Sequence, residues 1–179
     1  MKNLIKYIKS LDFEYAISYS GLRGEKFTKL EEENKKKINR LEKEIESSRL
    51  TEKSELTEEI EDLKKEVDIY NSRIITNKGI SHKSTLQIHK FRKDDKEIHE
   101  IFEILNSKFE EQHFWMCPPI FRDAIVFYSE DGEIKGILQM CFSCSWIKNE
   151  NEEDFQVDYK IFPRLMNLLI QLGHNIENE

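Results

Sequence analysis

The chain has 179 residues, 35% of them charged, and a formal net charge of -7 at pH 7. This length suits one ordinary domain plus an extension. No segment approaches the roughly 20 apolar residues that span a bilayer, and lysines interrupt the apolar core that a signal peptide would need at the start of the chain. We therefore expect a cytoplasmic protein without a membrane span, in which the cysteines are reduced rather than joined in disulfides.

Residues 1–27 predict a short amphipathic helix followed by a loop. Four apolar residues share one helical face, namely Leu4, Ile5, Ile8 and Leu11. We expect this face to pack on the rest of the protein, and the alternative is a membrane-surface helix with lysines at the interface. Glycines and serines in residues 18–24 predict the loop.

Residues 28–76 predict a long charged helix with coiled-coil character. Eleven basic and fourteen acidic residues make up about half of this segment. Thr28 and Glu31 have the spacing of a capping box, which marks the start of a helix. In the second half an apolar residue recurs every three or four positions, as in a heptad seam. The seam consists of Leu56, Ile60, Leu63, Val67, Tyr70 and Ile74.

A gap of eleven residues separates Ile45 from Leu56, the first residue of the seam. One continuous helix of about 48 residues absorbs this gap as a stutter, whereas a helical hairpin would turn within residues 47–51. We expect the continuous helix because those residues include no Gly, Asn or Asp. A lone helix would leave the seam in water, so we expect self-association into a dimer or higher oligomer, or a protein partner.

Residues 84–179 predict a small acidic α+β domain, with one antiparallel sheet and helices on one face. The net charge of this part is -8, which excludes useful affinity for nucleic acid because phosphates would be repelled. The predicted elements are a strand at 85–91, a helix from Asp94, a hairpin of strands at 124–128 and 134–144 around Asp131-Gly132, and a helix from Pro163 to Gly173.

Three cysteines meet at the open end of the predicted hairpin: Cys117, Cys141 and Cys144. With the Asp-Gly pair as the turn, paired residues on the two strands have numbers that sum to 263, which places Cys117 beside Cys144. Buried structural thiols are one interpretation. A zinc site with His113 or His174 as the fourth ligand is another, and a redox dithiol is the third. The expected cofactor is therefore none or zinc.

The cysteine-bearing hairpin resembles an uncharacterised family of small bacterial proteins. That family has a Cys, a Pro-Arg pair, an apolar strand, a Gly turn and a strand that ends in Cys-Phe-x-Cys. The resemblance covers about residues 85–175 and leaves out the long helix. This chain departs from the pattern in that Pro119 and Arg122 are separated and Gln139 stands in place of an acid. The resemblance implies that the cysteines form a unit, and it implies no activity.

We expect an interaction or accessory protein that associates through its long helix and carries a cysteine cluster. The alternative is a thiol- or zinc-dependent enzyme that uses Cys117, Cys141, Cys144 and His113. A third possibility is a small acidic inhibitor of a basic partner, such as the immunity protein of a nuclease toxin, for which the charge of residues 84–179 is the argument.

Overall fold

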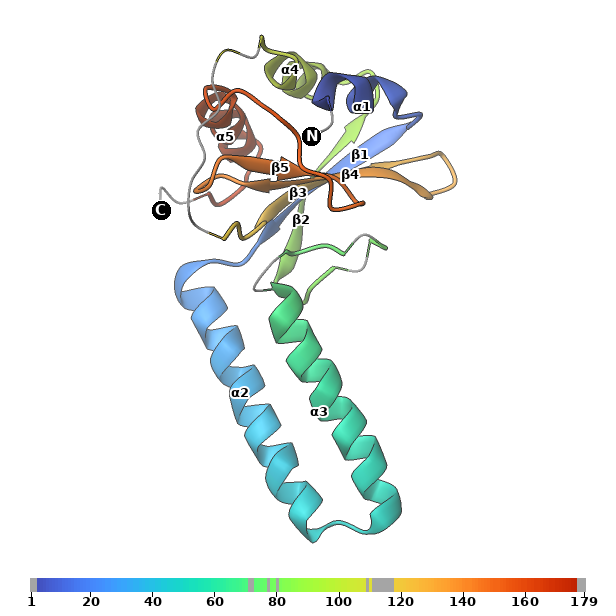
Figure 1. Ribbon diagram of the computed structural model, residues 1–179, viewed down its shortest axis with the longest axis vertical. Helices are drawn as coiled ribbons and strands as arrows, with labels where there is room; N and C mark the ends of the chain where they lie inside the picture. Colours follow the sequence, from blue (N-terminus) through green and yellow to red (C-terminus); the bar gives the residue numbers. More distant parts are fainter. Residues whose placement is uncertain are drawn as a thin grey trace.

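The computed structural model describes residues 3–70, 73–76, 78–79, 81–108, 110 and 118–176, with the side chains at 50–51 and 65–70 left out. Five helices and five strands occur in this part of the chain (Figure 1). They are α1 (Leu4–Ser10), β1 (Tyr15–Gly21), α2 (Gly24–Ser47), α3 (Leu50–Tyr70), β2 (Thr85–Arg92), α4 (Lys96–Leu105), β3 (Asp123–Tyr128), β4 (Ile134–Cys141), β5 (Trp146–Lys148) and α5 (Ile161–Gln171).

The five strands form one antiparallel sheet in the order β2-β1-β3-β4-β5. Helices α1, α4 and α5 cover one face of this sheet, and together they enclose the main apolar core. Phe91, Phe127 and Leu165 are fully buried in that core. The prediction of an α+β fold with helices on one face of an antiparallel sheet is thus confirmed. We call all elements other than α2 and α3 the sheet domain.

Residues 18–21, predicted as part of a loop, instead belong to β1, which lies between β2 and β3 in the sheet. The strand alternates large residues such as Tyr15 and Ile17 with small ones. Ala16 and Ser18, both fully buried, lie among the small ones. Ala16 packs in the main core, and serines carry little strand signal in a sequence. The sheet domain therefore includes the start of the chain and does not begin at residue 84.

The long segment predicted as one helix is an antiparallel helical hairpin formed by α2 and α3, which we call the arm. Its turn uses no glycine. The hydroxyl of Ser48 donates to the carbonyl of Glu44 at 2.6 Å, and the Arg49 amide donates to the carboxylate of Glu52 at 3.2 Å. These side chains satisfy helix-end groups that would otherwise lack partners. The helix also begins at Gly24 rather than at Thr28.

The described part of the predicted seam packs inside the arm. Ile60 and Leu63 of α3 are buried with Leu41 of α2. The partly buried residues around this cluster are Ile38, Ile45 and Leu56. Ile74 lies beyond α3 and is buried on the sheet, and the side chains of Val67 and Tyr70 lie outside the described residues. Coiled-coil packing and association between chains both stay predictions.

The β3–β4 hairpin has the predicted register over most of its length. Asp123 pairs with Met140 and Phe127 pairs with Gly136, which matches the sum of 263. The returning strand ends earlier than predicted, at Cys141, because the chain turns at residues 142–145 and starts β5. Trp146 therefore pairs with Cys141, and Cys144 lies in the turn. Among the described helices, none is long and apolar enough to cross a membrane.

Candidate functional site

The two described cysteines lie at the end of β4 in a small apolar cluster. Cys141 and Cys144 are buried together with Phe121, and Trp146 packs against them. Cys141 is a free thiol whose sulfur lies 3.4 Å from the hydroxyl of Ser143. Cys144 is disulfide-bonded, which corrects the expectation that the cysteines are reduced.

The zinc hypothesis finds no ligand set in the part of the chain that the structure describes. No three His, Cys, Asp or Glu side chains gather there in a way that could hold a metal ion. Zinc binds a thiolate, and the sulfur of Cys144 is already in a disulfide. His174 hydrogen-bonds to Asp123 instead of pointing to the cysteines. Cys117 and His113 lie outside the described residues, so their proximity to Cys144 stays a prediction.

A buried polar cluster, which sequence reasoning missed, lies where β1 and β3 meet the end of α5; we call it the Asp123 centre. One carboxylate oxygen of Asp123 accepts from the Ser20 hydroxyl and from His174 Nδ1, both at 2.9 Å. The other oxygen accepts from the Arg23 guanidinium at 2.5 Å. The Asp123 and His174 side chains are at most 1% exposed.

The Asp123 centre has the residue types of a hydrolytic triad but lacks its order. In a triad the histidine lies between the serine and the carboxylate, whereas here Asp123 lies between Ser20 and His174. Arg23 directly precedes α2 and also donates to the carbonyl of Asn175 at 3.2 Å. The arrangement therefore fits a structural tie between the arm, β3 and the C-terminal segment.

The acidic loop at residues 149–154, read from sequence as a solvated loop, directs several of its carboxylates inward. Glu150 accepts from the Tyr7 hydroxyl at 2.5 Å and from the Ile137 amide at 3.0 Å. Asp154 accepts from the Trp146 indole at 2.6 Å. Burial and the hydrogen bond to Glu150 raise the pKa of Tyr7 well above its ordinary value. The loop is thus hydrogen-bonded to α1, β4 and β5.

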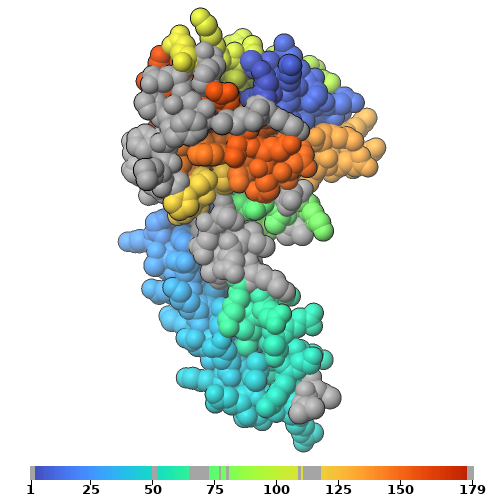
Figure 2. Space-filling model, in the orientation of Figure 1, coloured from blue at the N-terminus to red at the C-terminus, as the bar shows by residue number. Residues whose placement is uncertain are grey.

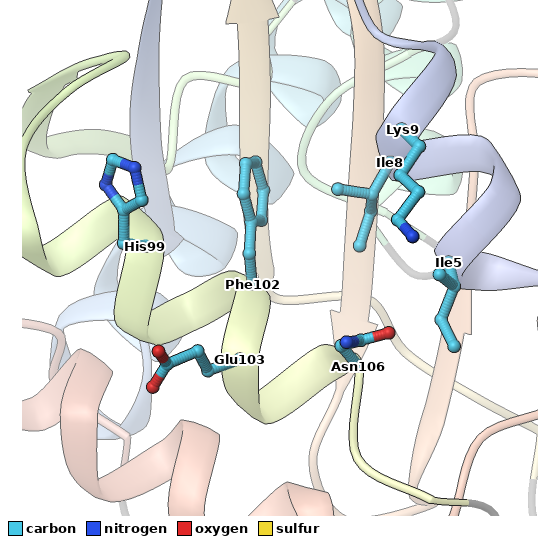
Figure 3. Close-up of a pocket in the computed structure, with 7 residues that line it drawn as sticks. All are labelled: Ile5, Ile8, Lys9, His99, Phe102, Glu103 and Asn106. Atoms are coloured by element: carbon cyan, nitrogen blue, oxygen red, sulfur yellow. The ribbon is translucent and has the colours of Figure 1, made fainter.

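The predicted packing of the first helix is confirmed for Leu4, Ile8 and Leu11, which contact the main core. Ile5 lines a hollow that the sequence did not reveal. Leu4 is buried in the main core, and Tyr7 packs on Phe155 with ring centroids 5.0 Å apart. Ile5 and Ile8 face α4 across a groove of about 250 Å³ (Figure 3). The helical stripe was visible in the sequence, but the hollow depends on how two helices meet.

The arm extends away from the sheet domain (Figure 2). Its root is held from two sides. Phe27 of α2 packs against the face of the sheet opposite the helices, where Ile74 and Ile75 are 0% and 1% exposed. The Ile74 amide donates to the carbonyl of Phe121 at 3.1 Å. On the other side Arg23 enters the Asp123 centre.

Comparison with family models, with curated proteins and with solved structures finds no match to this chain.

Proposed function

We propose that this is an interaction protein that binds a protein partner through the outward faces of its arm. The observation that carries the proposal is the contrast between the root and the rest of the arm. Buried groups fix the root, whereas further out the arm packs only on itself among the described residues. A helix of 24 residues extends about 36 Å at 1.5 Å per residue. Such a projection contributes little to the core and presents a large surface to a partner.

The outward faces of the arm include an exposed basic cluster on α2 and an exposed acidic cluster on α3, although α2 as a whole has seven acidic and seven basic residues. On α2 the exposed residues Lys36, Arg40 and Lys43 follow helical spacing on the side away from Leu41. On α3 the exposed residues Glu55, Glu58 and Asp62 lie on one face in the same way. A partner with complementary charges would be steered to the arm, and its affinity would fall as salt is raised.

Self-association through the predicted seam would require the arm to open. Ile60 and Leu63 are only 6% and 4% exposed because they contact α2. We therefore place the partner contact on the outward faces rather than on the seam. Sedimentation velocity of the purified chain tests this choice. If the chain were a dimer that Leu63→Asp dissociates, the contact would lie on the seam and not on the outward faces.

Site-specific photo-crosslinking in cells tests the proposal. A photoreactive amino acid would replace Arg40 or Glu58 on the arm, with Glu130 and Gln171 as exposed control positions on the sheet domain. We expect one adduct of defined mass from the arm positions, and we expect its loss when Lys36 and Lys43 are changed to Glu. Adducts that form equally from all four positions, or only from the controls, would contradict the proposal.

A further inference from the structure

An apolar groove separates α1 from α4 on the surface of the helix layer. Ile5 and Ile8 come from α1, and Phe102 comes from the middle of α4. Figure 3 shows Ile8 and Phe102 on opposite sides of the hollow. All three side chains are only partly buried. Two helices thus present an apolar channel that none of the other described elements covers.

The two sides of the groove carry opposite charges. Lys9 lies on the α1 side, and Glu103 lies on the α4 side, with its carboxylate pointing away from Lys9 (Figure 3). Both residues are exposed. Asn106, at the end of α4, adds an amide that can donate and accept hydrogen bonds. An occupant that matches these sides needs an acidic group along α1 and a basic group along α4.

The size of the groove favours side chains over a small molecule. Its volume of about 250 Å³ is below the roughly 300–1,000 Å³ of pockets that enclose drug-sized ligands. A second hollow of about 130 Å³ adjoins it and shares Ile5 and Asn106 as lining residues. The second hollow is lined also by residues 156–158 and Ile161. Two neighbouring hollows suit successive side chains on one face of a third helix.

We propose that this groove binds an amphipathic helix of a partner protein. Apolar residues of that helix would fill the space between Ile8 and Phe102, with an acidic residue beside Lys9 and a basic residue beside Glu103. The helix would lie on the surface of the layer that α1, α4 and α5 form over the sheet. This surface is separate from the arm, so either proposal can fail without the other.

Two synthetic helical peptides test the charge pattern. Both have about 16 residues, which suffices for partial helicity in water, and both carry the same leucine face. The matched peptide has Glu along one flank and Lys along the other, whereas the neutral peptide has Gln along both flanks. Amide chemical shifts of the full chain would report binding. We expect the matched peptide to bind several-fold more tightly, with shifts confined to α1 and α4, because its flanks form attractive pairs with Lys9 and Glu103.

A single charge reversal makes the test specific. Lys9 is exposed, so Lys9→Glu should keep the fold; both sides of the groove are then acidic, and the preference for the matched peptide should be lost in either direction of binding. Lys135→Glu, at an exposed residue of β4 outside the groove, is the matched control and should leave the preference unchanged. Equal binding of the two peptides, shifts outside the groove, or a preference that survives Lys9→Glu would overturn the proposal. Concentration-dependent shifts in the groove without peptide would overturn it in favour of a second copy of this chain.

Discussion

The arm and the sheet domain differ in what holds each of them together. The sheet domain buries a continuous core from both ends of the chain, with residues such as Phe91, Ile125 and Leu165 at 0% exposure. The described interior of the arm has three buried residues. Exposed ion pairs also link its helices, such as Lys37 with Glu59 at 2.7 Å, but such pairs contribute little. A two-helix unit of this kind is marginal alone, so the arm depends on its root for order.

The largest effect should come from breaking the buried ion pair at the root. Asp123→Ala would leave Arg23 and His174 buried without their carboxylate, at a cost of about 3–5 kcal/mol in the free energy of unfolding. Urea unfolding followed by tryptophan fluorescence measures it. Lys64→Ala is the control, since it breaks an exposed pair with Glu42 and should cost less than about 1 kcal/mol. Similar losses in both variants would contradict a structural role for the Asp123 centre.

Matched leucine truncations compare the two regions directly. Leu165→Ala should lower the stability of the sheet domain by about 2–5 kcal/mol, since Leu165 is fully buried. Leu63→Ala removes a similar contact, but we expect its effect to stay in the arm, where amide hydrogen exchange should become faster. If Leu63→Ala lowered the unfolding midpoint of the sheet domain as much as Leu165→Ala, the two regions would be a single cooperative unit.

Reduction of the disulfide at Cys144 should lower the stability of the sheet domain alone. The chain has three cysteines; Cys144 is disulfide-bonded, and Cys141 is a free thiol. We expect peptide mapping without reductant to find Cys117 joined to Cys144. Reduction should then cost the sheet domain about 2–5 kcal/mol and leave exchange in the arm unchanged. A map that joins Cys141 to either of the others would refute this pairing.

At alkaline pH we expect a smaller loss in the free energy of unfolding of the sheet domain. Burial and Glu150 raise the pKa of Tyr7 in the folded state, whereas an unfolded tyrosine ionises near pH 10. The contribution of protonated Tyr7 to the free energy of unfolding is therefore fully present below about pH 10. Above that pH it decreases by about 1.4 kcal/mol per pH unit. Tyr7→Phe should flatten this decline in urea midpoints measured between pH 9 and 11. An unchanged slope would show that Tyr7 ionises as freely as in the unfolded chain.

Local signals in the sequence predicted the parts of the fold that depend on neighbouring residues. The Asp131-Gly132 pair predicted the β3–β4 hairpin. Next to the turn Tyr128 pairs with Ile134, a sum of 262, and an irregularity between Phe127 and Tyr128 restores the predicted sum of 263. Gly132 has a φ of +82°, a conformation that glycine adopts without strain. The apolar stripe after Asp94 likewise predicted α4.

The parts that were missed depend on contacts between distant residues. Strand β1 is buried by helices that lie far along the chain, and its serines give no local signal of a buried strand. The turn of the arm relies on serine hydroxyls rather than on glycine. The Asp123 centre joins positions 20, 23, 123 and 174, so no spacing within a short window reveals it. The groove likewise depends on the angle between two helices.

The point where the arm joins the sheet has a consequence for how the chain folds. The chain leaves the sheet at Gly21 and returns at Thr85, which is the ladder partner of Gly21. Bringing two such distant residues together costs more entropy as the intervening loop lengthens. Helices form within about a microsecond, faster than distant strands pair. Transient formation of the arm, although marginal alone, therefore brings β1 and β2 side by side, and the pairing of these strands then stabilises the arm.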